Sequence, residues 1–300
     1  MRLLAVFFLL LLTASSTFGQ EVQRLDVTEK GLVAHVFKPA TKGPHPAVML
    51  LGGSGGGIGW QDQMADILAR RGFVAMSVAY FGMEGLPPEL ERIPQEYFET
   101  ALQWLLRQSY VDARRVGVGG VSKGGEIALL LASRRPEFRA VATFVASGVV
   151  FQSIAKGFPK TSSWSHQGRD IPFVAYGSVA NPSSTAEFYE AGLRQTNALE
   201  QATIPVERIN GPILLMSGKA DNLWPSSMLS EMVMTRLREK KFKHPYEHIA
   251  YPDAGHLISS IRTDDVTRRG GTLAGNRTAQ EDGQQRFINF FERYLRLGKR

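Results

Sequence analysis

The chain has 300 residues, of which 43% are hydrophobic and 21% are charged, so it can form one large globular domain and is not expected to be disordered. It contains no cysteine, which excludes disulfides, thiol nucleophiles and cysteine-based metal sites. Lysine and arginine outnumber aspartate and glutamate by 35 to 28, but no basic stripe with interleaved aromatic residues occurs, so we expect no nucleic-acid partner. The six histidines lack metal-ligand spacing, and we expect neither a metal nor another cofactor.

Residues 1–19 have the pattern of a secretory signal peptide. Met1-Arg2 carries one positive charge, residues 3–12 form an apolar run, and small or polar residues follow at 13–19. The apolar run is too short for a full membrane span. We therefore expect cleavage after Gly19 and a secreted or periplasmic mature protein with no stable membrane span. The alternative is that the segment remains as an uncleaved anchor.

From residue 20 onward, apolar runs typical of strands alternate with amphipathic runs typical of helices. Buried strands in such an alternation indicate a mostly parallel, doubly wound sheet with helices on both faces. We therefore expect residues 20–300 to form a single α/β domain. Strands are predicted at 22–28, 32–37, 46–51, 73–80, 116–121, 140–146, 212–216 and 246–250, and helices at 61–71, 94–108, 123–134, 225–240 and 278–297.

Residues 151–211 interrupt this alternation and are too long for a plain connection. The stretch includes a short strand near Phe173 and a helix at about 184–201. We predict a small lid over the catalytic site, although an excursion at the sheet edge, away from the site, is the alternative. Its aromatic residues suit the wall of an acyl pocket: Phe158, Trp164, Phe173 and Phe188. The candidate substrate contacts are Trp164, Phe173 and, after the lid, Trp224.

The most informative motif is Gly120-Val121-Ser122-Lys123-Gly124, a G-x-S-x-G pattern between a predicted strand and a predicted helix. A strand that turns directly into a helix brings two backbones close together, which explains the glycines. The serine in such a turn is strained and raised above the sheet, and the helix N-terminus points its free N–H groups at the same place. We predict that Ser122 is a nucleophile and that the Lys123 N–H helps to form an oxyanion hole.

A second G-x-S-x-G stretch occurs at residues 52–56, again after an apolar strand. More glycine follows it in place of a helix, so nothing there would hold Ser54 rigidly. We predict that this stretch is the oxyanion loop, with the Gly53 N–H as the first candidate donor and Ser54 as the second.

A serine nucleophile needs a base, and the base needs an orienting acid. Asp221 and His256 follow the strands at 212–216 and 246–250, in the chain order that α/β-hydrolases use. Each lies in a loop at the carboxyl end of a strand, where open α/β sheets place their sites. We predict His256 as base and Asp221 as acid, with Asp253 as the alternative acid. Separately, Asn276-Arg277-Thr278 forms a glycosylation sequon.

Several stretches resemble the catalytic domain shared by type-I acyl-CoA thioesterases and bile acid-CoA:amino acid N-acyltransferases, a family of the α/β-hydrolase fold. The resemblance runs from about Lys42 to the C-terminus and implies the same Ser122, Asp221 and His256. The acyltransferase branch uses a cysteine nucleophile, which this chain lacks, so the resemblance favours hydrolysis. The most specific matches are Gly120-Val121-Ser122-Lys123-Gly124-Gly125-Glu126, Ile204-Pro205-Val206-Glu207-Arg208 and Tyr251-Pro252-Asp253-Ala254-Gly255-His256.

The sequence therefore predicts an α/β-hydrolase with a lid that cleaves a small-molecule acyl thioester or ester through an acyl-enzyme on Ser122. Two alternatives stay open: a carboxylesterase or dienelactone-hydrolase-like enzyme, and an inactive member that only binds a ligand. The family's N-terminal β-sandwich is not in this sequence, and the expected export separates the protein from cytosolic CoA esters. The acyl chain, the leaving group, protein partners and the oligomeric state are not given by the sequence.

Overall fold

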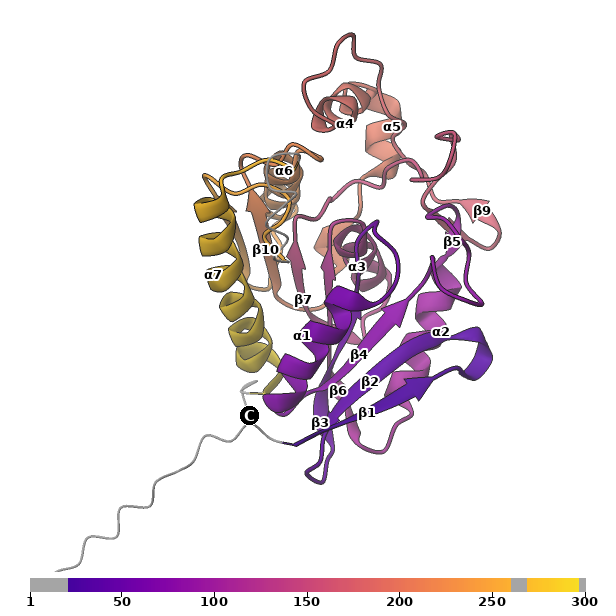
Figure 1. Cartoon of the computed structure of the whole chain (residues 1–300), viewed down its shortest axis with the longest axis vertical. Helices are drawn as coiled ribbons and strands as arrows, with labels where there is room; N and C mark the ends of the chain where they lie inside the picture. Colours follow the sequence, from indigo (N-terminus) through magenta and orange to yellow (C-terminus); the bar gives the residue numbers. More distant parts are fainter. Residues whose placement is uncertain (1–20, 260–268, 297–300) are drawn as a thin grey trace, which may run out of the picture.

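An eight-stranded sheet forms the centre of the protein in a computed structural model, which describes residues 21–259 and 269–296 (Figure 1). The strand order is β1-β2-β4-β3-β6-β7-β10-β11. Pairing is antiparallel from β1 to β2 and from β2 to β4, and parallel across the rest of the sheet. The strands are β1 (Val22–Val27), β2 (Val33–Pro39), β3 (His45–Leu51), β4 (Val74–Ala79), β6 (Val111–Val121), β7 (Phe138–Phe144), β10 (Ile213–Gly218) and β11 (Tyr246–Tyr251).

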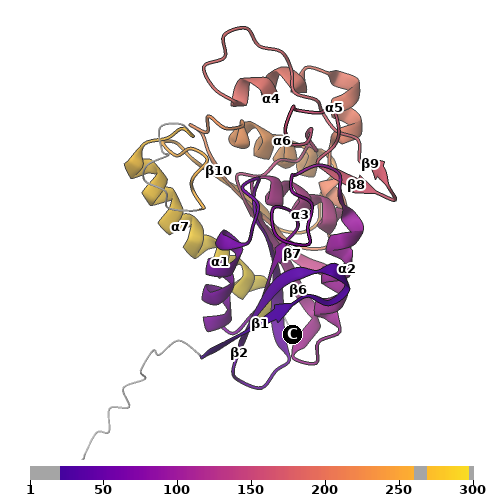
Figure 2. The same cartoon turned by 45° about the vertical axis from the view of Figure 1, so that its right-hand side comes forward.

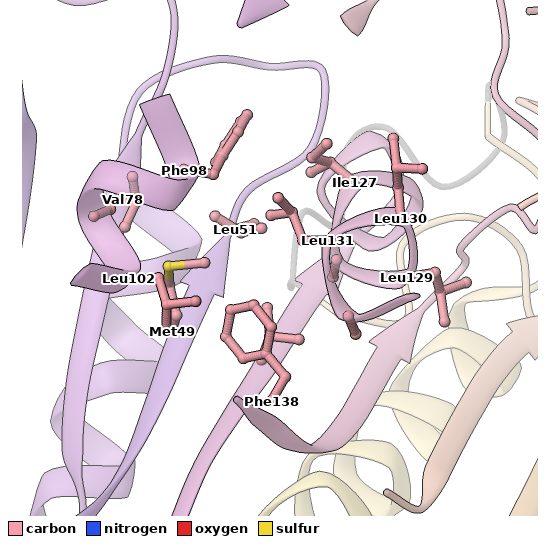
Figure 3. Close-up of a cluster of buried hydrophobic side chains, with 14 of the residues drawn as sticks. Met49, Leu51, Val78, Phe98, Leu102, Ile127, Leu129, Leu130, Leu131 and Phe138 are labelled. Atoms are coloured by element: carbon pink, nitrogen blue, oxygen red, sulfur yellow. The ribbon is translucent and has the colours of Figure 1, made fainter. Parts of the chain in front are cut away.

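Helices cover both faces of this sheet, as the alternating sequence pattern predicts. On one face, α1 and α7 pack against a cluster that includes Leu50, Phe144 and Phe287. On the other face, α2 and α3 enclose a cluster that includes Met49, Phe98 and Phe138, shown in Figure 3. The helices are α1 (Gly59–Arg70), α2 (Gln95–Leu106), α3 (Lys123–Arg134), α6 (Ser226–Glu239) and α7 (Leu273–Phe291). None of the described helices has the length and apolar character required to cross a bilayer.

The predicted lid segment, residues 151–211, carries helices that lie at one end of the molecule (Figures 1 and 2). It contains β8 (Trp164–His166), which pairs with β5 (Ile93–Pro94) and with β9 (Arg169–Asp170). The helix predicted at 184–201 is wrong as a single element. The chain instead forms two helices, α4 (Ala186–Leu193) and α5 (Thr196–Ala202), because Gln195 leaves the helical conformation with a ψ of 79°.

Helix α7 begins five residues before its predicted start at residue 278. Thr272 caps it, since the Thr272 side chain accepts a hydrogen bond of 2.9 Å from the Gly275 N–H. Asn276 of the sequon consequently lies inside a helix, and it is only 5% exposed. A buried helical asparagine is a structural residue, and its side-chain contacts are described below.

Of the predicted signal peptide and the predicted oxyanion loop, the structure describes only the loop. Residues 1–19 lie outside the described residues, so cleavage after Gly19 and a secreted or periplasmic location stay predictions. The stretch predicted to be the oxyanion loop, residues 52–56, is described in full and directly follows β3. Because β3, β6, β10 and β11 are all parallel, the loops that follow these four strands meet at one edge of the sheet.

Candidate active site

Ser122 occupies the sharp turn between β6 and α3 in a conformation that non-glycine residues seldom adopt. Its φ is 55° and its ψ is −122°, and such strain costs on the order of 1–3 kcal/mol. Two hydrogen bonds hold the turn: the Ser122 N–H donates to the Phe144 carbonyl at 2.9 Å, and the Glu126 N–H donates to the Ser122 carbonyl at 3.0 Å. The neighbouring strand and the first turn of α3 therefore fix the serine in place.

The glycine at position 124 permits a very close backbone contact at the site. A Cβ on Gly124 would lie 2.2 Å from the carbonyl oxygens of both Leu51 and Gly52. Any side chain there would force the first turn of α3 away from the loop that follows β3. The G-x-S-x-G spacing thus serves to bring the glycine loop against the serine turn.

His256 links Ser122 to Asp221 through two hydrogen bonds. His256 Nε2 is 3.1 Å from Ser122 Oγ, and His256 Nδ1 is 2.8 Å from Asp221 Oδ2. The other carboxylate oxygen, Asp221 Oδ1, accepts the N–H groups of Leu223 at 3.0 Å and Trp224 at 3.3 Å. All three predicted residues are buried and lie within hydrogen-bond reach.

The alternative acid, Asp253, lies elsewhere. Asp253 is exposed, and its backbone carbonyl accepts a hydrogen bond from the Thr272 N–H at 2.9 Å. The partner of His256 Nδ1 is therefore Asp221, which stands on the loop after β10 and not on the loop that carries the histidine.

A short segment before α7 connects the loop that carries Asp221 to the loop that carries His256. The Arg269 carbonyl accepts the N–H groups of His256 at 3.0 Å and Asn222 at 3.4 Å. The Asn276 side chain adds two hydrogen bonds: its Oδ1 accepts the Gly255 N–H at 2.8 Å, and its Nδ2 donates to the Gly270 carbonyl at 3.2 Å. We call residues 269–276, with these hydrogen bonds, the clasp. Sequence reasoning noticed Asn276 only as a sequon and missed this role.

Two backbone N–H groups, those of Gly53 and Lys123, are the predicted donors of an oxyanion hole at Ser122. A Cβ on Gly53 would lie 3.2 Å from Ser122 Cβ and 3.8 Å from Ser122 Oγ, so the glycine loop passes directly beside the serine. Within residues 21–259 and 269–296, the N–H groups of Gly53 and Lys123 have no hydrogen-bond acceptor. Unpaired donors beside a nucleophile are what an oxyanion hole requires.

The Lys123 side chain forms a fully buried ion pair. Its Nζ lies 3.0 and 3.1 Å from the two carboxylate oxygens of Glu126 and donates to the Phe151 carbonyl at 3.2 Å. The Trp164 indole N–H donates to Glu126 at 2.7 Å. Burial lowers the pKa of Lys123 and raises the pKa of Glu126, while the charge of each partner opposes the shift of the other.

Two cavities meet at Ser122, and both also reach Ser54 and Leu223. The first, of about 600 Å³, runs beneath the lid. The second, of about 480 Å³, runs along the glycine loop and is lined by Gly53, His256 and Arg269. The lid residues that line the first cavity are Gln152, Ile154, Phe158, Lys160, Tyr176, Thr185, Phe188 and Tyr189, and Trp224 joins them from the loop before α6.

The structure separates the three predicted substrate contacts. Trp224 lines the cavity beneath the lid, and its indole N–H donates to the Val145 carbonyl at 2.9 Å. Trp164 does not line it, because its ring is fully buried and bound to Glu126. Phe173 packs against the main core cluster and is not among the lining residues either. Tyr176 and Tyr189, which sequence reasoning missed, line this cavity together with Ser122.

The fold and the Ser–His–Asp hydrogen-bond chain define a protein of the α/β-hydrolase fold. A putative dienelactone hydrolase from Klebsiella pneumoniae subsp. pneumoniae MGH 78578 has a TM-score of 0.59 and 17% identity, covering 91% of this chain and 99% of that one. Acylaminoacyl peptidase from Pyrococcus horikoshii has a TM-score of 0.59 and 16% identity, covering 92% of this chain and 41% of that one. At these identities the likeness shows the fold alone.

The family follows from sequence. The family model described as BAAT / Acyl-CoA thioester hydrolase C terminal matches residues 93–297, and the chain belongs to this family. It is 30% identical over 289 residues to acyl-coenzyme A thioesterase 6 of Mus musculus, and 29% identical over 288 residues to bile acid-CoA:amino acid N-acyltransferase of Mus musculus. Each match covers 91% of this chain and 66% of the relative, so the chain spans about two thirds of their length.

The clasp leads to a prediction for Asn276→Ala. This change leaves the buried Gly255 N–H without an acceptor, and an unsatisfied buried group costs about 1–3 kcal/mol. We expect the free energy of unfolding, measured by urea denaturation, to fall by that amount. Asn289→Ala is the control, since Asn289 is exposed on the same helix. Equal losses in the two variants would contradict the clasp.

Proposed function

We propose that the protein is a serine hydrolase that cleaves acyl thioesters or esters through an acyl-enzyme on Ser122. The observation that carries the proposal is the hydrogen-bond chain from Ser122 Oγ through His256 to Asp221. Membership of a family whose relatives include acyl-coenzyme A thioesterases supports the thioester as substrate.

The chemistry follows from the geometry. Ser122 Oγ attacks the acyl carbon while His256 Nε2 takes the serine proton, and the carboxylate of Asp221 stabilises the imidazolium through Nδ1–H. The negative charge that develops on the acyl oxygen is received by the N–H groups of Lys123 and Gly53. His256 then gives its proton to the leaving thiolate or alkoxide. In the second half, His256 takes a proton from water and the resulting hydroxide attacks the acyl carbon. The bond between the acyl carbon and Ser122 Oγ then breaks, His256 returns the proton to Ser122 Oγ, and the free acid leaves.

The two cavities support an assignment for each of the two parts of the substrate. His256 lines the cavity along the glycine loop, so the group that it protonates departs on that side. The acyl group then occupies the cavity beneath the lid, whose walls include Phe158, Phe188 and Trp224. The lid therefore supplies acyl selectivity, while the loops at the sheet edge supply the chemistry.

An ester in place of a thioester is the second candidate. The structural likeness to a dienelactone hydrolase shows that the fold is shared with such enzymes, and the oxyanion geometry serves either acyl group. Parallel kinetics on thioesters and oxygen esters with the same acyl group separate the two: a higher kcat/KM on thioesters supports the thioesterase.

Ser122→Ala is expected to reduce kcat by about 10⁴–10⁶-fold while the protein folds normally, because no other group forms the acyl-enzyme. The measurement is hydrolysis of an acyl thioester, paired with labelling by a fluorophosphonate probe. Ser54→Ala, in the other G-x-S-x-G stretch, is the matched control and should retain labelling. An unlabelled wild-type protein would indicate an inactive ligand-binding member, and a severe loss in Ser54→Ala with a mild loss in Ser122→Ala would reverse the assignment.

The lid assignment predicts that Phe188→Ala changes the preference among acyl chain lengths. Each buried methylene contributes about 0.8 kcal/mol, or roughly fourfold in kcat/KM. Because the smaller alanine side chain enlarges the pocket, the variant should favour longer acyl chains. Phe173→Ala is the matched control, because this half-buried phenylalanine belongs to the same lid but packs against the core. The check is kcat/KM across a homologous series of thioesters. A uniform loss over all chain lengths in Phe188→Ala would contradict the acyl-pocket assignment.

A further inference from the structure

Tyr80 makes a contact with the oxyanion loop that the mechanism above does not use. The residue directly follows β4 and is 2% exposed. Its hydroxyl donates a short hydrogen bond to the carbonyl oxygen of Gly52. The ring is held by aromatic neighbours, with centroids 5.2 Å from Phe98 and 5.7 Å from Trp164. The hydroxyl thus approaches the glycine loop from a fixed position in the core.

This hydrogen bond sets the orientation of one peptide plane. The Gly52–Gly53 peptide is trans, so the Gly52 carbonyl and the Gly53 N–H point in opposite directions. A hydroxyl that holds the carbonyl toward the core therefore directs the N–H away from the core. Gly53 itself lies beside Ser122 and lines the same cavity as His256.

The same peptide could also adopt the opposite orientation, with its carbonyl and N–H exchanged. Glycine adopts both signs of φ readily, and residues 52 and 53 are both glycine, so their own conformational preferences do not fix the orientation of this peptide. Rotation of the plane would place the Gly52 carbonyl beside Ser122, where it would repel a developing oxyanion. An external hydrogen bond is needed to keep the donor, and not the acceptor, at the nucleophile.

The hydroxyl is suited to this task because it stays protonated. Burial and the nearby Glu126 carboxylate both raise the pKa of Tyr80. The same Glu126 is bound to Lys123 Nζ and to the Trp164 indole. The Tyr80 ring thus packs against Trp164, which belongs to the buried polar cluster of Lys123, Glu126 and Trp164.

We propose that Tyr80 is a positioning residue, whose hydroxyl holds the Gly52–Gly53 peptide so that the Gly53 N–H faces the acyl oxygen of the substrate. This inference rests on the proposed function, since an oxyanion forms only if Ser122 attacks an acyl group. Tyr80 itself does not touch the reacting atoms and acts through the peptide that it orients.

Tyr80→Phe tests the proposal with the loss of a single oxygen atom. Loss of one oxyanion donor lowers kcat by about 10²–10³-fold, and a donor that is present but free to rotate retains part of its effect. We therefore expect kcat on an acyl thioester to fall by about 10–100-fold with little change in KM. Binding of a trifluoromethyl ketone, which forms a tetrahedral oxyanion on Ser122, should weaken by a similar factor.

Tyr97→Phe is the matched control. The Tyr97 hydroxyl also donates to a backbone carbonyl, that of Ala79 at 2.7 Å, but Tyr97 lies on α2 and contacts β2 through the Val33 N–H. Both variants should lower the melting temperature by a few degrees, since each leaves a carbonyl without its donor. Only Tyr80→Phe should lower kcat and weaken binding of the ketone.

The outcomes separate the two levels of the account. If wild-type protein reacts with a fluorophosphonate probe at Ser122 but Tyr80→Phe and Tyr97→Phe have the same kcat, the hydroxyl of Tyr80 is merely structural and the positioning role is overturned. If the wild-type protein neither reacts with the probe nor hydrolyses acyl thioesters and esters, the proposed function fails and this inference fails with it.

Discussion

The structure of the site depends on one backbone contact, where the loop after β3 meets the first turn of α3. A Cβ on Gly124 would lie 2.2 Å from two carbonyl oxygens of that loop, so the contact exists only because the position is glycine. It brings Gly53 beside Ser122, and it places the strained serine turn under the glycine loop. A side chain as small as one methyl group at this position would move Gly53 away from Ser122, and with it one of the two donors that we propose for the oxyanion hole.

The positions of Asp221 and His256 depend on a second set of contacts, between their two loops and the segment before α7. Asp221 and His256 come from different loops, and the segment that ends at Asn276 hydrogen-bonds to both loops. The His256 ring is therefore oriented by its hydrogen bond to Asp221, and the His256 main chain is held by its hydrogen bond to the Arg269 carbonyl. Rigid support of this kind matters because a nucleophile and its base must meet within a few tenths of an ångström.

Sequence reasoning predicted those features that depend on local pattern and chain order. The alternation of strands and helices gave the doubly wound sheet, and the positions of Ser122, Asp221 and His256 after parallel strands correctly indicated that the three would meet. The fold is shown by the comparisons and by the sheet order, whereas the catalytic roles stay a proposal.

The features that could not be predicted are contacts between distant segments. Nothing in the sequence around Trp164 shows that its indole binds Glu126, 38 residues earlier. Tyr80 lies 28 residues from Gly52, and Asn276 lies 21 residues from Gly255, so their roles appear only after folding. Two misses had a local signal. The i, i+3 spacing of Lys123 and Glu126 is typical of a helical ion pair, and Thr272 was a readable helix cap.

The central claim is that acyl transfer proceeds through Ser122, and the most direct measurement is the mass of a trapped acyl-enzyme. The protein is mixed with an acyl thioester, quenched in acid within milliseconds and digested, and its peptides are analysed by mass spectrometry. The account predicts one acyl group on the peptide that contains Ser122. An acyl group on the peptide that contains Ser54, or hydrolysis with no acylated peptide at any quench time, would contradict it.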